Sequence, residues 1–270
     1  MTTALVLAGG GVTGIAWETG VLLGLQENGR LQDPDLVVGT SAGSVVGAQL
    51  LSGTPLVELF ARQVADEHQE IDPQLDLTPL IAFFTEMGDI SAGVAPEKLV
   101  EVGDFAKRAR TVPPAERRAV IEWRLPSHEW PATALRITAV DADTGELVVL
   151  DASSGVSLVD AVMASCAVPG VWPPVPLLGR TLIDGGTRSI TNLDLAAGAD
   201  DVLVLAPLTQ GPLRAIVEKD AAELGARVTV VLADAEAEEA MGPNALDPSR
   251  RRAAAEAGLR QGRAIGQALS

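Results

Sequence analysis

Short apolar runs recur along most of the chain, and stretches with helical spacing separate them. Residues 5–7, 36–38, 202–205 and 228–232 are rich in Val and Leu, and a glycine or a charged residue lies at or near their ends. Runs of this length and composition predict strands that are buried on both faces. Because apolar helical stretches such as residues 14–27 alternate with these runs, the pattern predicts an α/β fold.

The pattern changes between residues 54 and 131. Apolar residues with helical spacing alternate there with breaks at Pro and Gly, and strand-like runs are few. We therefore predict a helical insertion that lies over the sheet like a lid. It holds all four phenylalanines of the chain, which are expected to contribute to its core: Phe60, Phe83, Phe84 and Phe105.

Strand-like sequence returns after the insertion. The predicted elements there are a hairpin at 135–140 and 147–150, a helix at 158–167 and a strand pair around 178–180. The last part, about residues 245–270, predicts a C-terminal helix on the surface. No internal repeat or linker divides the chain, so residues 1–270 are predicted to form one domain.

Composition is consistent with one large domain. The chain has 270 residues, of which 47% are hydrophobic, and a mean hydropathy of +0.24, which suits a substantial apolar core. The formal net charge is 20 − 36 = −16, which argues against nucleic-acid binding and against general attraction to anionic membranes. With one cysteine, Cys166, and two histidines, neither a disulfide framework nor a metal or other cofactor is expected.

The N-terminal residues predict a strand and not a targeting signal. They lack a basic segment and lead directly into a glycine loop, so no signal peptide is predicted. No apolar run is long enough to span a bilayer. We expect a cytoplasmic protein, with transient contact at a membrane surface left open. The oligomeric state is also left open.

The segment Gly39-Thr40-Ser41-Ala42-Gly43 has the strongest chemical signal. It follows a predicted strand and precedes a predicted helix, the setting of a nucleophile elbow. The tight turn strains the serine backbone, and flanking glycines avoid the resulting clashes. A turn of small residues is the simpler alternative, since the pentapeptide alone matches many loops.

A second glycine segment, Gly9-Gly10-Gly11-Val12-Thr13-Gly14, lies between the first predicted strand and helix. Backbone N–H groups in such a loop can stabilise an oxyanion beside a nucleophilic serine. The segment also matches the Gly-x-Gly-x-x-Gly motif of dinucleotide-binding folds, so nucleotide binding is an alternative. That motif requires an acidic residue at the end of the second strand, where this chain continues into the serine turn instead.

The base that would activate the serine is not predicted to be a histidine. His68 and His128 fall in the predicted insertion, on a solvated helix face and in a surface loop. Asp184 instead follows a predicted strand and precedes Gly185 and Gly186. This arrangement directs a carboxylate out of a strand end, although an ordinary Asp-Gly turn is the alternative.

The order of these three motifs resembles the patatin-like phospholipase family, over roughly residues 4–206. The family resemblance implies a three-layer α/β/α fold with a mostly parallel sheet and a Ser–Asp dyad without histidine. Ser41 would attack an acyl ester, Asp184 would accept its proton and later activate water, and the backbone N–H groups of Gly10 and Gly11 would hold the oxyanion. The implied site therefore comprises the dyad, the oxyanion loop (Gly9, Gly10, Gly11 and Gly14), the elbow residues (Gly39, Thr40, Ala42 and Gly43) and Gly185 and Gly186.

The resemblance implies a lipid or other acyl-ester substrate but leaves its head group and chain length open. The family often has a basic residue where this chain has Thr13. Phe83, Phe84 and Phe105 would then line an acyl-chain groove or form the core of the lid. Asn192 would position the Asp184 loop or stabilise its own turn. A silent scaffold that binds a lipid or a protein partner is the second alternative.

Overall fold

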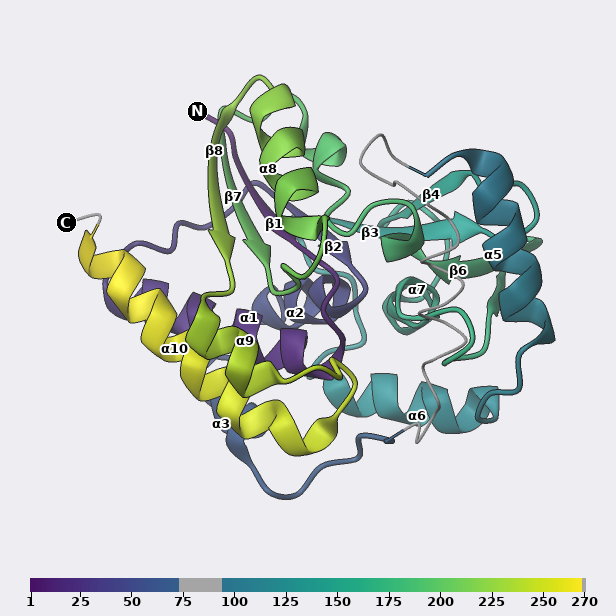
Figure 1. The fold of residues 1–270 in the computed structure, drawn as a ribbon, viewed down its shortest axis with the longest axis horizontal. Helices are drawn as coiled ribbons and strands as arrows, with labels where there is room; N and C mark the ends of the chain where they lie inside the picture. Colours follow the sequence, from purple (N-terminus) through teal and green to yellow (C-terminus); the bar gives the residue numbers. More distant parts are fainter. Residues whose placement is uncertain (73–93, 269–270) are drawn as a thin grey trace.

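The computed structural model describes residues 1–72 and 94–268. Within them, eight strands form one mixed sheet (Figure 1). Its main path is β5-β6-β3-β2-β1-β7-β8, and β4 pairs with β3 beside this path. The strands are β1 (Thr3–Leu7), β2 (Leu36–Thr40), β3 (Ala134–Asp141), β4 (Leu147–Leu150), β5 (Val175–Leu177), β6 (Arg180–Asp184), β7 (Asp201–Ala206) and β8 (Arg227–Leu232).

Most of this sheet is parallel. Strands β3, β2, β1, β7 and β8 run in the same direction, whereas β4 and β6 are antiparallel to β3 and β5 is antiparallel to β6. The predicted mostly parallel α/β sheet and the β3–β4 hairpin are therefore confirmed. Carboxyl ends of parallel strands share one edge of a sheet, which is the usual place for a site in such folds.

Helices cover both faces of the sheet. They are α1 (Gly11–Glu27), α2 (Ala42–Leu50), α3 (Leu56–Val64), α5 (Pro96–Arg108), α6 (Pro114–Arg124), α7 (Leu158–Ser165), α8 (Leu213–Glu223), α9 (Ala235–Met241) and α10 (Arg251–Ala268), with short 3₁₀ turns η1 (Gly185–Thr187), η2 (Leu193–Ala196) and η3 (Pro248–Arg250). Helix α1 begins at Gly11, three residues before the predicted start.

The alternation along β1 divides the core into two layers. Leu5 and Leu7 pack with α1 and α2, whereas Ala4 and Val6 pack with Val217 of α8 and with η2. Side chains that alternate between two apolar faces are typical of a central strand covered on both sides. The three-layer α/β/α arrangement is thus the observed one.

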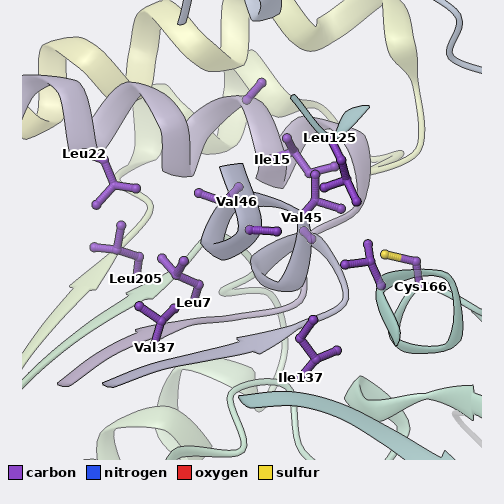
Figure 2. Close-up of a cluster of buried hydrophobic side chains, with 14 of the residues drawn as sticks. Leu7, Ile15, Leu22, Val37, Val45, Val46, Leu125, Ile137, Cys166 and Leu205 are labelled. Carbon is purple, nitrogen blue, oxygen red and sulfur yellow. The ribbon is translucent and has the colours of Figure 1, made fainter. Parts of the chain in front are cut away.

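Helix α2 lies between α1 and the sheet, as Figure 2 shows. Its Val45 and Val46 are buried among Ile15 of α1, Leu7 of β1 and other apolar residues of the same cluster. A helix that is apolar on both sides is held firmly, because every side of it loses contacts if it moves. The residue at its N-terminus is Ser41.

The region predicted as an insertion, 54–131, contributes α3, α5 and α6 to the described residues. Helix α5 packs Leu99 and Val102 against Val140 and Ile183 at the β3–β6 end of the sheet. Phe60 packs against the main core, and the ring of Phe105 lies beside Gly170. Phe83 and Phe84 lie outside the described residues. The lid-like role of this region stays a prediction.

Helix α10 lies within the C-terminal segment predicted to be a surface helix, with one face exposed at residues such as Glu256 and the other covered by α1. It packs along α1 at close range, and Figure 1 shows it beside α1 at the edge of the molecule. A Cβ atom at Gly258 would lie 2.2 Å from the carbonyl oxygen of Trp17, and one at Gly20 would lie 2.2 Å from that of Ala255. The glycines let the two backbones approach, so the contact depends on small residues rather than on a wide apolar face.

Replacing Gly258 with alanine is expected to destabilise the protein by about 1–3 kcal/mol, because the added methyl group overpacks the contact with α1. The same change in an exposed helix normally stabilises by about 0.5–1 kcal/mol. Urea unfolding followed by circular dichroism measures the difference, with the exposed Glu256→Ala of the same helix as control. A stabilised Gly258→Ala protein would contradict the packing.

Candidate active site

Ser41 lies between β2 and α2 in a strained backbone conformation. Its φ is 51° and its ψ is −112°, and only Leu178 and Asn192 share a positive φ among the described residues other than glycine. Such a conformation costs about 1–3 kcal/mol and persists only where its surroundings hold it. The side chain is buried to all but 7% of its surface.

Hydrogen bonds to its backbone hold Ser41 in this conformation. Its N–H donates to Oγ of Ser165 at 2.9 Å, and its carbonyl accepts from Oγ of Ser44 at 2.7 Å and from Sγ of Cys166 at 3.3 Å. Ser165 and Cys166 come from the end of α7, far away in the sequence. Neither residue was singled out from the sequence as a partner of Ser41.

The two elbow glycines are required by close contacts. A Cβ atom at Gly43 would lie 2.0 Å from the carbonyl oxygen of Leu7, and one at Gly39 would lie 2.7 Å from that of Gly43. No other residue type fits these positions without movement of the backbone. This packing brings the N-terminus of α2 against the carboxyl end of β1.

Strand β3 sets the distance between Ser41 and Asp184. Thr40, the last residue of β2, pairs with Thr138, and Asp184, the last residue of β6, pairs with the next residue, Ala139. The ends of β2 and β6 therefore meet at consecutive positions of one strand. Two residues that lie more than a hundred positions apart in the chain are in this way brought to one point of the sheet.

The carboxyl group of Asp184 is buried and asymmetrically bonded. Its Oδ1 accepts the N–H of Gly186 at 2.7 Å, whereas Oδ2 has no hydrogen bond of ordinary geometry with the residues described. The nearby hydroxyl of Ser41 lowers the pKa of the carboxyl, although no hydrogen bond of ordinary geometry from a described residue reaches Oδ2. Catalytic hydrogen bonds are often long before a substrate binds.

Burial dominates the acidity of Asp184. It raises the pKa of the carboxyl from 3.8 to about 6, against the smaller lowering effects of Ser41, the Gly186 N–H and Arg117. A carboxylate with a pKa near 6 is ionised at neutral pH but accepts a proton more readily than an ordinary aspartate.

Asn192 connects the two strand ends. Its side-chain amide donates to Oγ1 of Thr40 at 3.0 Å and to Oγ1 of Thr138 at 3.2 Å, and contacts the carbonyl oxygens of Gly185 at 3.3 Å and Ser189 at 2.8 Å. The residue itself has a left-handed backbone. It therefore stabilises its own turn and also ties the Asp184 loop to β2, so both roles considered for it from the sequence are present.

The glycines of the loop differ in what their N–H groups bind. The N–H of Gly9 donates to the carbonyl of Ile190 at 2.8 Å, and that of Gly14 donates to Gly10 at 2.8 Å. Both groups are therefore occupied, whereas those of Gly10 and Gly11, the two donors that the family resemblance implies, have no such bond to a described residue. The role of Gly9 and Gly14 is steric, since a Cβ at Gly9 would lie 2.8 Å from Cδ1 of Ile190 and one at Gly14 would lie 3.1 Å from Cγ of Pro207.

Four N–H groups near Ser41 remain unbonded within the described part of the chain, those of Gly10, Gly11, Val12 and Ala42. Gly11 has a φ of 62°, and a Cβ there would lie 2.4 Å from the carbonyl oxygen of Ala245. Helices α1 and α2 begin at Gly11 and Ala42. The dipoles of both helices therefore add positive potential beside Ser41.

A small cavity opens beside these groups. It is lined by Gly11, Val12, Ile15, Ser41, Ala42, Arg117, Arg124, Cys166, Val168, Trp172 and Leu246. Its volume of about 10 Å³ is close to the space that one water molecule needs. An ester is larger, so it reaches Ser41 only if lining side chains move. Arg117 and Arg124 come from α6 and were not singled out from the sequence.

Neither histidine lines this cavity. Both are exposed, as predicted, but His68 follows α3 in an irregular segment and not on the predicted helix face. Nδ1 of His68 accepts the N–H of Glu70, and Nε2 of His128 lies 3.1 Å from the carbonyl of Glu122. Among residues 1–72 and 94–268, His, Cys, Asp and Glu side chains form no group of three that would hold a metal ion.

The fold and the site geometry together define the class to which the protein belongs. It is an α/β protein in which a serine and an aspartate lie at neighbouring strand ends beside a glycine loop. The chain belongs to the patatin-like phospholipase family, whose model matches residues 5–197, more than half of its length. A search of curated proteins found no significant match.

Several solved structures are similar to the chain. VipD from Legionella pneumophila aligns with a TM-score of 0.46 and 14% identity, over 99% of this chain and 67% of that one. The type III effector ExoU aligns with a TM-score of 0.47 and 18% identity, over 99% of this chain and 53% of that one. The ExoU–SpcU complex of Pseudomonas aeruginosa aligns with a TM-score of 0.43 and 18% identity, over 96% of this chain and 51% of that one. The chain thus spans about half to two thirds of these proteins.

Proposed function

We propose that the protein hydrolyses carboxylic esters of lipids through a dyad of Ser41 and Asp184. The observation that carries this proposal is the register of β3: Thr40, the residue before the strained serine, and Asp184, whose Oδ2 is free, pair with consecutive positions of that strand. Membership of the patatin-like phospholipase family supports the same reaction class.

In the proposed first step, Oγ of Ser41 attacks the ester carbonyl while its proton passes to Asp184. The tetrahedral intermediate collapses to an acyl-enzyme, and the departing alkoxide takes the proton from Asp184. A water molecule then attacks the acyl-enzyme, with Asp184 as its base. The products are the carboxylic acid and the free serine. A carboxyl pKa of about 6 suits both directions of proton transfer near neutral pH.

The negative charge that develops on the carbonyl oxygen is assigned to the free backbone donors. The N–H groups of Gly11 and Ala42 border the same cavity as Ser41, and that of Gly10 precedes them in the loop. One donor of this kind typically lowers the barrier by about 2.7–4 kcal/mol. Because they belong to helix N-termini, they are held in place before the substrate arrives.

Nucleotide binding is the weaker alternative. The third glycine of the triplet is packed against Ala245, and the acidic ribose contact expected after β2 is replaced by the serine turn. A silent lipid- or partner-binding scaffold would keep the fold without turnover. Assays of hydrolysis separate it from the proposed enzyme.

The proposed setting is a single domain that works in the cytoplasm and contacts a membrane surface transiently. Among the described residues, no helix is both long and apolar enough to cross a bilayer. The net charge of −16 disfavours general adhesion to anionic lipid. Contact with a lipid surface would therefore depend on the substrate site and not on overall charge.

Hydrolysis of p-nitrophenyl acetate, butyrate and palmitate by the purified chain tests the proposed activity. We expect turnover above the buffer rate, and a preference for the longer acyl chains if lipid is the substrate. A folded protein that cleaves none of these esters and no phospholipid in mixed micelles would contradict the proposal. Activity on acetate alone would restrict it to small esters.

A further inference from the structure

Arg117 is a buried arginine that the proposed mechanism does not use. It lies on α6 with only 3% of its surface exposed, and its guanidinium carbon is 3.9 Å from the ring centroid of Trp172. Its Nε and Nη1 atoms have no hydrogen-bond partner among the described residues. Stacking on Trp172 leaves the N–H groups at the edge of the guanidinium plane, so these donors are available to a ligand.

The neighbouring charges do not neutralise Arg117. The carboxylates of Glu70 and Asp184 act on Arg117 through their charge without a hydrogen bond to it. Glu70 forms its ion pair with Arg124, through Nε at 3.0 Å and Nη2 at 2.5 Å. Arg251 is also buried, and its Nη2 donates to the carbonyl of Arg62 at 2.6 Å. Three buried arginines thus share one buried glutamate, and Arg117 has no direct partner there.

Arg117 borders the same cavity as Ser41. Burial lowers the pKa of its guanidinium to about 9, so the group still carries its charge at neutral pH. A buried and unpaired cation is costly to a fold. An anion that entered the cavity would offset that cost, and the planar fork of an arginine matches the oxygens of a phosphate or carboxylate.

The glycine loop does not provide this cation. Thr13 stands where the family often has a basic residue, and its hydroxyl lies 3.4 Å from the carbonyl oxygen of Ala245 as a donor. The positive charge beside Ser41 therefore comes from α6, on the other side of the cavity.

We propose that Arg117 binds an anionic group of the substrate beside Ser41, so that the site prefers esters carrying a phosphate or carboxylate near the scissile bond. The inference rests on the proposed hydrolase function and specifies its substrate class. It makes Arg117 a specificity residue, distinct from the donors that stabilise the oxyanion.

Two matched pairs of esters test it. Oleoyl lysophosphatidic acid and monooleoylglycerol differ by a phosphate on the alcohol side, and the p-nitrophenyl monoesters of glutaric and valeric acid differ by a carboxylate on the acyl side. We expect the anionic member of at least one pair to have a kcat/KM about tenfold to a hundredfold higher, the range of a hydrogen bond to a charged group. The pair that responds identifies the anion and its side.

Arg117→Met is expected to reduce this preference to about unity, because kcat/KM for the anionic ester falls to that of its neutral partner. Assays are run well above the pKa of Asp184, of about 6, because Arg117 also lowers that pKa. Arg117→Lys retains the charge and should keep part of the preference. Arg110→Met, which removes an exposed arginine, is the matched control.

Circular dichroism establishes that each variant is folded. If Arg117→Met does not fold, the comparison of wild type with Arg117→Lys decides. A wild type that cleaves both members of each pair equally overturns this inference and leaves the hydrolase proposal intact. A wild type that cleaves no ester contradicts the hydrolase proposal itself, so the two failures are distinct.

Discussion

Ser41→Ala is expected to lower ester hydrolysis by about 10⁴-fold or more while the protein stays folded. Loss of a nucleophile removes the covalent route entirely, and what remains comes from binding and the oxyanion donors. The bonds that hold the turn are made by the backbone of residue 41, so alanine keeps them. Initial rates with p-nitrophenyl butyrate measure the loss.

The matched control is Ser249→Ala, which removes an exposed hydroxyl that does not line the cavity. It should retain full activity. A Ser41→Ala protein with wild-type turnover would show that another group performs the chemistry. Ser41→Gly adds a structural test, because glycine relieves the positive φ of 51° and should be more stable than alanine at this position.

Asp184→Asn is expected to lower kcat by about 10³-fold or more and to stabilise the protein at neutral and alkaline pH. The amide cannot accept the serine proton, which accounts for the loss of activity. The wild-type kcat/KM should rise with pH through the pKa of Asp184, of about 6. Asp33→Asn, on an exposed loop, is the control for loss of one negative charge.

The sign of the stability change follows from the raised pKa. Below about pH 4, Asp184 is protonated in both the folded and the unfolded chain, so its burial carries no charge penalty. Between that pH and about 6, stability falls as pH rises, because only the unfolded chain ionises freely. The gain from Asp184→Asn should therefore be near zero at the acid end and reach about 1–3 kcal/mol above the folded pKa. Urea unfolding at a series of pH values measures it. A stability gain of Asp184→Asn that grows toward acid pH would contradict a carboxylate destabilised by its burial.

Much of the site was predictable from local sequence. The elbow around Ser41 is encoded by glycines at both sides, and Asp184 by its place between a strand and two glycines. Both signals are local because each reports a backbone that only small residues permit. The pairing of the two residues was expected only from the family resemblance; its physical cause is the register of β3, which no local pattern encodes.

Other features depend on contacts between distant segments. Gly9 and Gly14 satisfy the loop motif, yet Ile190 and Gly10 occupy their N–H groups, and no sequence pattern distinguishes them from Gly11. Arg117 lies on an amphipathic helix among other arginines, so its burial against Trp172 gives no local signal. The packing of α10 had a detectable signal, since Gly258 and Gly262 repeat at the spacing of one helix face.

The most direct test of the central claim is peptide mapping after treatment with a fluorophosphonate. The reagent reacts with an activated serine, and the elbow peptide holds Ser41 beside Ser44, whose hydroxyl donates to the carbonyl of Ser41 at 2.7 Å. We predict one phosphonyl adduct, on Ser41, that disappears in Ser41→Ala and forms much more slowly in Asp184→Asn. An adduct on Ser44 or another serine, or unchanged labelling in Asp184→Asn, would contradict the account.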